Sequence, residues 1–299
     1  VYTSMGDGAW TDADTWTENF DFVSLSSYTG STGTAHVEDA DDLIGNNMDD
    51  ADGEFTLDNV APSGYDAYFD VGYSVGTANQ DSVYFTFDLA ELGAWYFYTI
   101  TDESGNDVDG NGIVMSMTEV VSGIAVSGLE DGTLTLEFWL EDVAGNVGAV
   151  DSDTTEKDTV AATVESITVS EDTDNGILTE NDEEFWVWIT YDDDMDTSST
   201  PLVSFDPTLD STLSCLGGWA LDEMTWVYAC VITDSNEDVE DIDVSVSGGV
   251  DAFGNAVAGT FTETDAFDVD MLQPTVTNVE VNPNPALAGP VNLTLSLSE

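Results

Sequence analysis

Aspartate and asparagine recur at one fixed spacing in this sequence, and their side-chain oxygens are of the kind that binds calcium. The pattern Asp-x-x-Gly-Asn occurs at 42–46, 142–146 and 251–255. Ca²⁺ takes carboxylate, amide and carbonyl oxygens as ligands. The same aspartate can instead shape a tight turn by accepting hydrogen bonds from nearby backbone N–H groups. The pattern alone leaves both interpretations open.

Each copy is followed by a similar acidic segment, at 55–63, 155–163 and 267–275. In a β-sandwich the loop between the last two strands lies at the end where the preceding domain enters. We therefore expect each turn to approach the acidic joint before its own domain, where shared carboxylates would hold a Ca²⁺ that stiffens the junction. The expected ligands are Asp58, Asp142 and Asn146 at the first joint, and Asp158, Asp251 and Asn255 at the second.

A second calcium candidate is the glycine-rich stretch 107–118. Asp107, Asp109 and Asn111 occupy positions 1, 3 and 5 of a calcium loop, with glycine at position 6. The match is partial because position 12 is Thr118 and the carboxylate of Glu119 comes one residue late. The alternative is a hairpin turn between two strands at 95–100 and 112–117.

Cys215 and Cys230 are the two cysteines of the chain, and they flank two extended runs joined by a turn near residues 222–223. This arrangement predicts a cross-strand disulfide, which agrees with an oxidising compartment; two free buried thiols are the alternative. The single histidine, His36, is far from both cysteines in sequence. Zinc sites and nucleophiles of the Cys/His type are therefore excluded.

The elements that must position these residues are strands, because apolar residues alternate with period two almost throughout. Val83, Phe85 and Phe87 fall on one face, and the apolar residues of 134–140 do the same. The segment 185–191 is apolar on both faces and is typical of a central strand. Turn residues separate such runs every 8 to 12 residues or so, as in an antiparallel sandwich. The sequence predicts an all-β fold.

The charge of the chain excludes whole classes of function. It has 62 acidic residues against one Lys or Arg, a formal net charge of −61, yet 41% of its residues are hydrophobic. Nucleic acids and anionic membranes require clustered basic residues, so neither is an expected partner. Self-repulsion at this charge calls for saline surroundings or bound divalent cations. No carboxylate pair stands in an apolar segment that would tune it for catalysis, so we expect no enzyme activity.

The closing turns also predict the domain organisation. We expect a partial domain at 1–58, complete domains at 59–158 and 159–270, and the opening strands of a further domain at 271–299. Three explanations of the end segments remain open. The chain is a segment of a longer tandem protein, its last strands complete the first domain of the next copy in a filament, or the ends are divergent small domains.

Two pairs of segments resemble a known family. Residues 62–87 and 126–159 are similar to the opening and closing parts of the tandem bacterial immunoglobulin-like repeats found in secreted and surface-attached proteins, including adhesins, surface-layer proteins and filament proteins. Residues 192–205 and 244–270 resemble a related subtype. The resemblance implies tandem immunoglobulin-like β-sandwich domains, which serve as spacers, stalks, lattice modules and binding heads alike.

These observations predict a structural extracellular protein at a cell surface, a subunit of a filament, sheath or lattice whose partners are copies of itself. A stalk segment of a long adhesin is the first alternative. A carbohydrate-binding module is the second, because exposed tryptophans can stack on sugars, although Trp also fills sandwich cores. The tryptophans in question are Trp10, Trp16, Trp139 and Trp219. Asn292, in Asn-Leu-Thr, is a glycosylation sequon expected on a solvent face.

Overall fold

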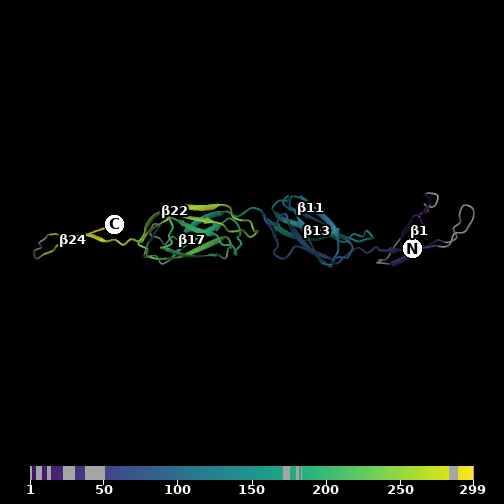
Figure 1. The fold of residues 1–299 in the computed structure, drawn as a ribbon, viewed down its shortest axis with the longest axis horizontal. Coiled ribbons are helices and arrows are strands. Elements are labelled where there is room, and N and C mark those ends of the chain that lie inside the picture. The colour runs from purple at the N-terminus through teal and green to yellow at the C-terminus, as the bar shows by residue number, and fades with distance from the viewer. Residues whose placement is uncertain are drawn as a thin grey trace, which may run out of the picture. The chain divides into compact units, whose positions relative to one another are not determined.

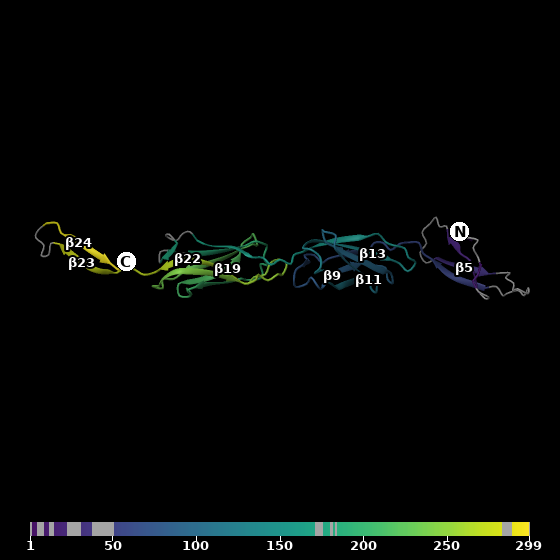
Figure 2. The same ribbon diagram turned by 90° about the horizontal axis from the view of Figure 1, so that it is seen from above.

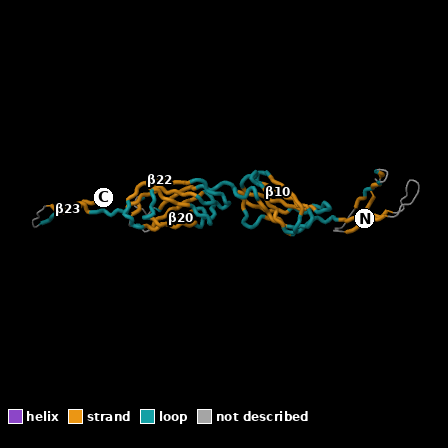
Figure 3. Tube along the Cα trace, in the orientation of Figure 1, coloured by secondary structure: helices purple, strands orange, loops and turns teal. Residues whose placement is uncertain are grey.

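The computed structural model describes residues 2–4, 9–11, 15–22, 31–37, 51–170, 176–179, 182, 184–282 and 289–298. Every regular element within these ranges is a β-strand, drawn in orange in Figure 3. Within these same ranges there is no helix with the length and apolar character needed to cross a membrane. The predicted all-β fold is confirmed.

The chain divides into two compact units, one of residues 1–74 and 79–157 and the other of residues 75–78 and 158–299. Each unit contains one sandwich of two mostly antiparallel sheets, and some of their strands are labelled in Figures 1 and 2. The copy of Asp-x-x-Gly-Asn at 42–46 lies outside the described residues.

The first sandwich has a sheet of order β11-β10-β13-β14-β8 and a sheet of order β12-β9-β7. Val83, Phe85 and Phe87 of β9 are fully buried, and the ring of Phe87 stacks on that of Phe138 from the other sheet with centroids 5.2 Å apart. The predicted alternation is confirmed. The strands are β7 (Asp66–Tyr68), β8 (Ser74–Val75), β9 (Val83–Asp88), β10 (Trp95–Thr101), β11 (Asp107–Ile113), β12 (Glu119–Ile124), β13 (Gly132–Glu141) and β14 (Asp151–Lys157).

The second sandwich has sheets of order β15-β17-β20-β19 and β16-β22-β21-β18. The inner residues of β17 are fully buried, while Trp186 and Trp188 stack along its outer face, so the predicted central strand is confirmed. The ring of Phe185 packs on that of Phe267 from the facing sheet, with ring centroids 4.6 Å apart. The strands are β15 (Val164–Val169), β16 (Ile177–Thr179), β17 (Glu184–Tyr191), β18 (Leu202–Asp206), β19 (Leu213–Trp219), β20 (Thr225–Ile232), β21 (Asp238–Ser247) and β22 (Thr260–Asp270).

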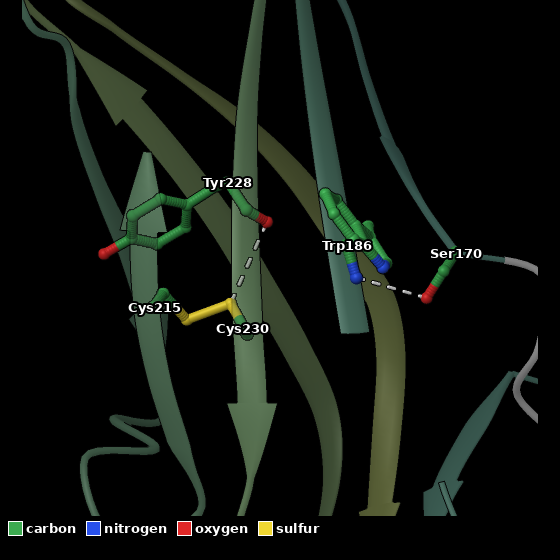
Figure 4. The surroundings of a disulfide bond; sticks show 5 residues. All are labelled: Ser170, Trp186, Cys215, Tyr228 and Cys230. Carbon is green, nitrogen blue, oxygen red and sulfur yellow. Dashed lines mark hydrogen bonds between the residues drawn. A yellow bond between two sulfur atoms is a disulfide. The ribbon is translucent and has the colours of Figure 1, made fainter. Parts of the chain in front are cut away.

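A disulfide joins Cys215 and Cys230, which face each other across β19 and β20 (Figure 4). Cys230 lies in the apolar core of the second sandwich. The turn between the two strands is shaped by Asp222, whose carboxylate accepts hydrogen bonds from the N–H groups of Met224 and Thr225. The structure therefore places the turn where the sequence predicts it.

Short antiparallel pairs make up the described remainder of the chain. The strands are β1 (Tyr2–Ser4), β2 (Ala9–Trp10), β3 (Trp16–Thr17), β4 (Phe20–Phe22), β5 (Ser31–Val37), β6 (Ala51–Leu57), β23 (Val276–Asn282) and β24 (Asn292–Leu297). They pair as β1 with β4, β2 with β3, β5 with β6 and β23 with β24. His36 of β5 is exposed and makes an ion pair with Asp52 across the β5–β6 pair.

The predicted hairpin after the strand at 95–100 is present, but its turn lies at 102–106, and residues 107–112, where the sequence predicts a turn or a calcium loop, belong to its second strand β11. The glycines have another purpose. A Cβ at Gly110 would lie 2.6 Å from Cε1 of Tyr98, and one at Gly112 would lie 2.7 Å from Cε1 of Tyr96. The glycines make room for two tyrosine rings of β10.

Candidate functional site

The turn between β13 and β14 holds the segment that enters the first sandwich. Asp142 Oδ1 accepts hydrogen bonds from the N–H groups of Ala144 and Asn146 at 2.8 and 2.9 Å. The side chain of Asn146 donates from Nδ2 to Asp142 Oδ2 at 2.8 Å and to the carbonyl oxygen of Asp58 at 3.2 Å. Asp142 and Asn146 thus lie at the first joint, as the sequence predicts.

The turn between β21 and β22 repeats this arrangement at the second joint. Asp251 Oδ1 accepts from the N–H groups of Phe253 and Asn255 at 3.0 and 2.8 Å. Asn255 Nδ2 donates to Asp251 Oδ2 at 3.0 Å and to the carbonyl oxygen of Asp158 at 3.0 Å. Asp251 is fully buried and Asn255 is 1% exposed. We call each set of linker carbonyl, Asn and Asp a clasp.

The clasp binds the linker through the asparagine amide, and the aspartate carboxylate is occupied by N–H donors. Burial raises the pKa of Asp142, but the hydrogen bonds from Asn146 and Ala144 outweigh burial and hold the pKa below its ordinary value of 3.8. The glycine at the fourth position adopts the left-handed conformation, with φ of 88° at Gly145 and 86° at Gly254. This geometry is that of the turn-shaping interpretation of the motif.

The linkers themselves share a local bond. Asp58 Oδ1 accepts from the N–H of Val60 at 3.0 Å, and Asp158 Oδ1 accepts from that of Val160 at 2.8 Å. The same bond joins Asp270 Oδ1 to the N–H of Leu272 at 3.1 Å, after the second sandwich. The aspartates expected as metal ligands at the joints therefore each orient their own linker.

A fourth copy of the motif, Asp102 to Asn106, was missed by the sequence analysis although its letters are the same. It forms the turn between β10 and β11, in the middle of the first sandwich. Asp102 accepts from Ser104, Asn106 and the N–H of Glu130, which replaces the linker contact. The motif therefore marks a turn type, and its position in the sandwich decides whether it meets a linker.

Asp102 gives a pH-dependent prediction. The N–H of Glu130 and then the side chain of Asn106 hold the pKa of Asp102 down, to about 2. A lowered folded-state pKa stabilises the fold above the unfolded value of 3.8, and this contribution is lost as the pH falls toward 2. Asp102→Asn should be less stable than the wild type at pH 7, with a difference that shrinks between about pH 4 and 2. Urea unfolding across this range measures it, and a pH-independent difference would contradict the proposed cause.

Lys157, the chain's single basic residue other than His36, ends β14 directly before the second linker. Its side chain is buried, with 4% of the residue exposed. Nζ donates to the carbonyl oxygen of Leu129 at 2.9 Å and pairs with Asp131 Oδ1 at 2.5 Å. The positive charge of Lys157 is therefore buried in the protein and does not screen the acidic residues of the surface.

Three other carboxylates gather where the ladder between β21 and β22 is irregular. Oxygens of Asp241, Asp265 and Asp268 lie within 4.8 Å of one another. The charge of Asp241, followed by burial and the charge of Asp268, raises the pKa of Asp265. Sequence reasoning missed this cluster because its members come from two strands and their meeting depends on the bulge.

The remaining predicted residues lie apart from the joints. Asp107, Asp109 and Asn111 alternate along one exposed face of β11, about 6.6 Å apart between successive members, and their role as calcium ligands stays a prediction. Trp139 stacks on Phe97 on the outer face of its sheet, whereas Trp219 contacts Tyr191 and Trp226 of the second core. The structure describes no side chain for Trp10 or Trp16.

Asn292 begins β24, opposite Asn282 and exposed to solvent. Its sequon partner Thr294 lies opposite Glu280, on the polar face of the β23–β24 pair. Glycosylation at Asn292 stays a prediction.

No protein-family model matches the sequence, and neither does any curated protein. Solved structures do. One, from work on host cell surface retention of a 1.5-MDa bacterial ice-binding adhesin, has 20% identity and a TM-score of 0.45 and covers 75% of this chain and 70% of that one. A Ca²⁺-stabilised adhesin with which an Antarctic bacterium reaches out and binds ice has 18% identity and a TM-score of 0.43, over 91% of this chain and 64% of that one.

A third structure is a tetra-tandem repeat from the extending region of a large adhesion protein, with 22% identity and a TM-score of 0.29, over 85% of this chain and 64% of that one. Similarities this low carry no argument about what the present chain binds. All three are described as adhesins or adhesion proteins.

Proposed function

We propose that this chain is a structural spacer of an extracellular surface protein, in which sandwiches follow one another through clasped linkers. The observation that carries the proposal is the repeated clasp, in which Asn146 binds the carbonyl of Asp58 and Asn255 binds that of Asp158. A linker whose backbone is hydrogen-bonded where it enters a sandwich has less conformational freedom. A spacer requires such restricted joints. A binding or catalytic role would have no use for the same bond at both joints.

Small-angle X-ray scattering of the purified protein tests the spacer. The double variant Asn146→Ala/Asn255→Ala should scatter as a broader ensemble than the wild type, while Asn106→Ala, which changes the same motif away from a linker, should not. Circular dichroism must show that all three proteins keep their strands. Scattering from the wild type that already requires a freely jointed ensemble would contradict the proposal.

Calcium is proposed as a stabiliser, at the cluster of Asp241, Asp265 and Asp268. Repulsion raises the pKa of Asp265, so its charge destabilises the fold once the pH rises through that pKa, and the penalty is absent below about pH 3.8. In EDTA at pH 7, Asp265→Asn should therefore melt above the wild type. Added Ca²⁺ should raise the melting temperature of the wild type more than that of the variant.

Asp210→Asn, which removes an exposed carboxylate elsewhere, is the control for simple loss of charge. Equal responses of the three proteins to Ca²⁺, measured by differential scanning fluorimetry, would show that the cluster is not the calcium site.

Assembly of copies into a filament, sheath or lattice is the second candidate function. The observation that favours it is the apolar face of β23–β24, where valine and leucine side chains are exposed. Salt would allow such assembly, because about 1 M salt shortens the Debye length to about 3 Å and lets copies this acidic approach one another.

A further inference from the structure

We propose that the outer face of the sheet formed by β11, β10 and β13 binds a polysaccharide that carries protonated amino groups. We call it the aromatic face. It combines aromatic rings, carboxylates and threonine hydroxyls at neighbouring positions of the three strands. The inference goes beyond the spacer role and does not depend on it.

Strand alternation determines which side chains of β10 lie on the aromatic face. The ring of Tyr96 packs in the core on that of Phe87, with centroids 5.5 Å apart. The ring of Tyr98 packs on that of Phe85, with centroids 5.2 Å apart. The residues that alternate with these tyrosines point outward. They are Trp95, Phe97, Thr99 and Thr101.

Aromatic rings lie at the end of this face where β10 begins. Trp95 is 45% exposed and lies opposite Ile113 of β11, which is 44% exposed. Phe97 lies opposite Trp139 of β13, and the two rings are 10° from parallel with centroids 5.6 Å apart. An exposed ring of this kind offers a flat apolar surface that the C–H groups of a sugar ring can cover.

Carboxylates flank the aromatic rings. Glu141 of β13 lies opposite Trp95. One step further along the face, Thr99 lies between Glu137 of β13 and Asp109 of β11. Glu137 and Asp109 are exposed, and neither side chain has an ion pair or hydrogen bond with another described residue. Both carboxylates can therefore accept charged donors from a ligand.

An open hollow of about 580 Å³ continues the face beyond these carboxylates. Threonine hydroxyls line it, and they can donate and accept hydrogen bonds, as the hydroxyl groups of a sugar do. Glu137 belongs both to this hollow and to the row that includes Thr99, so the hollow and the rings form one surface. The lining residues are Thr101, Asp102, Glu103, Thr133, Thr135 and Glu137.

The charge of the aromatic face favours one kind of ligand. The face has carboxylates and no basic side chain, and Lys157 is buried. Nucleic acids, acidic polysaccharides and a second copy of this chain are all anionic and would be repelled. A neutral sugar would leave the carboxylates without a counter-charge. A polysaccharide with protonated amino groups complements the rings, the carboxylates and the hydroxyls together.

The second sandwich offers a comparison in which the aromatic rings lack these neighbours. Trp186 and Trp188 stack along the outer face of β17 with centroids 6.4 Å apart. The residues opposite them on β20 are Ala229 and Val227. Of the two sandwiches, the first therefore has outward rings with carboxylates opposite or beside them. Trp188 is a matched control for Trp95.

Isothermal titration calorimetry of the purified 299-residue protein at about 0.15 M salt provides the test. The probe is a short glucosamine oligomer at a pH that keeps its amino groups protonated. The wild type should bind it. Trp95→Ala should bind about tenfold more weakly, because it loses the stacking on the sugar and the attraction between ring and ammonium group. Trp188→Ala should bind as the wild type does.

Further variants separate the loss of a ligand contact from damage to the fold. Trp95→Tyr keeps an aromatic ring and should keep most of the affinity. Glu141→Gln should weaken binding about threefold, and about 1 M salt should abolish this difference. Asp210→Asn, which removes an exposed carboxylate of the second sandwich, should not weaken binding. Circular dichroism and urea unfolding must show that each variant is folded.

Two other ligands separate recognition of the sugar from attraction by charge. The acetylated oligomer has the same sugar rings without the amino charge and should bind more weakly than the glucosamine oligomer. Oligolysine with the same number of charges has no sugar ring. Its affinity should therefore be lower, and it should change less than that of the glucosamine oligomer when Trp95 is replaced by Ala.

Four results would overturn the proposal. The wild type does not bind the glucosamine oligomer, or Trp95→Ala binds it as tightly as the wild type. The acetylated oligomer binds as tightly as the charged one, which would indicate a neutral sugar. Oligolysine loses as much affinity in Trp95→Ala as the glucosamine oligomer does, which would indicate recognition of any ammonium group. The spacer is tested separately by X-ray scattering without ligand, so either proposal can fail alone.

Discussion

Asn255→Asp should destabilise the second sandwich by about 3 kcal/mol, the largest effect that we expect from any single-atom change in the chain. The substitution replaces the Nδ2 donor by an oxygen. The carbonyl of Asp158 and the carboxylate of Asp251 both lose their hydrogen bond from this amide, and a second carboxylate is buried beside the first. Urea unfolding followed by tryptophan fluorescence at fixed salt measures the loss.

The other copies of the motif are internal controls for this effect. Asn146→Asp removes the same two bonds at a half-buried position, and Asn106→Asp removes the bond to Asp102 at an exposed position with no linker. The expected order of destabilisation is Asn255, then Asn146, then Asn106, with the last at about 1 kcal/mol. An Asn255→Asp protein that Ca²⁺ returns to wild-type stability would show that the joint accepts a cation and would contradict this order.

Lys157→Ala should destabilise the first sandwich by about 3 kcal/mol. The change leaves the carbonyl of Leu129 without its buried donor, removes the positive charge that pairs with Asp131 and opens a space where the four-carbon side chain lay. The pair is buried on the lysine side, so the loss should persist in high salt, unlike that of a surface ion pair. Urea unfolding at low and high salt checks both statements.

Two further variants separate the contributions of Lys157. Lys157→Met fills most of the space and should recover part of the loss, because the partly exposed Asp131 can turn to solvent. Asp131→Asn keeps an acceptor for Nζ and should cost about 1 kcal/mol. A Lys157→Met protein as stable as the wild type would show that the sandwich has no need of this charge.

The fold could be predicted from the sequence because its signal is local. Alternation at 83–87 and 134–140 fixes which residues face the core, and a strand apolar on both faces, such as 185–191, has to be central. The turn at Asp222 is stabilised by a hydrogen bond that its carboxylate accepts from the N–H of Thr225, three residues later. Such features require no knowledge of distant partners.

The errors and omissions arose where a distant residue decides the outcome. The positions of Gly110 and Gly112 resemble those of a calcium loop in sequence. Glycine is needed there because the rings of Tyr98 and Tyr96 occupy the space that a side chain would take. Asp241, Asp265 and Asp268 meet only through a shifted register between two strands. The approach of Asn146 and Asn255 to the linkers was predictable, since it follows from the position of the closing turn in a sandwich, whereas the bonding of the amide to a backbone carbonyl was not.

The burial of Lys157 also determines how resistant the folded protein is to proteases of the trypsin type. Digestive and secreted proteases of the trypsin type cut after lysine or arginine, and this chain offers one such bond. That residue is 4% exposed and held in β14, so the folded protein presents no cleavage site to these enzymes. Trypsin should therefore cut this chain only after the first sandwich has opened.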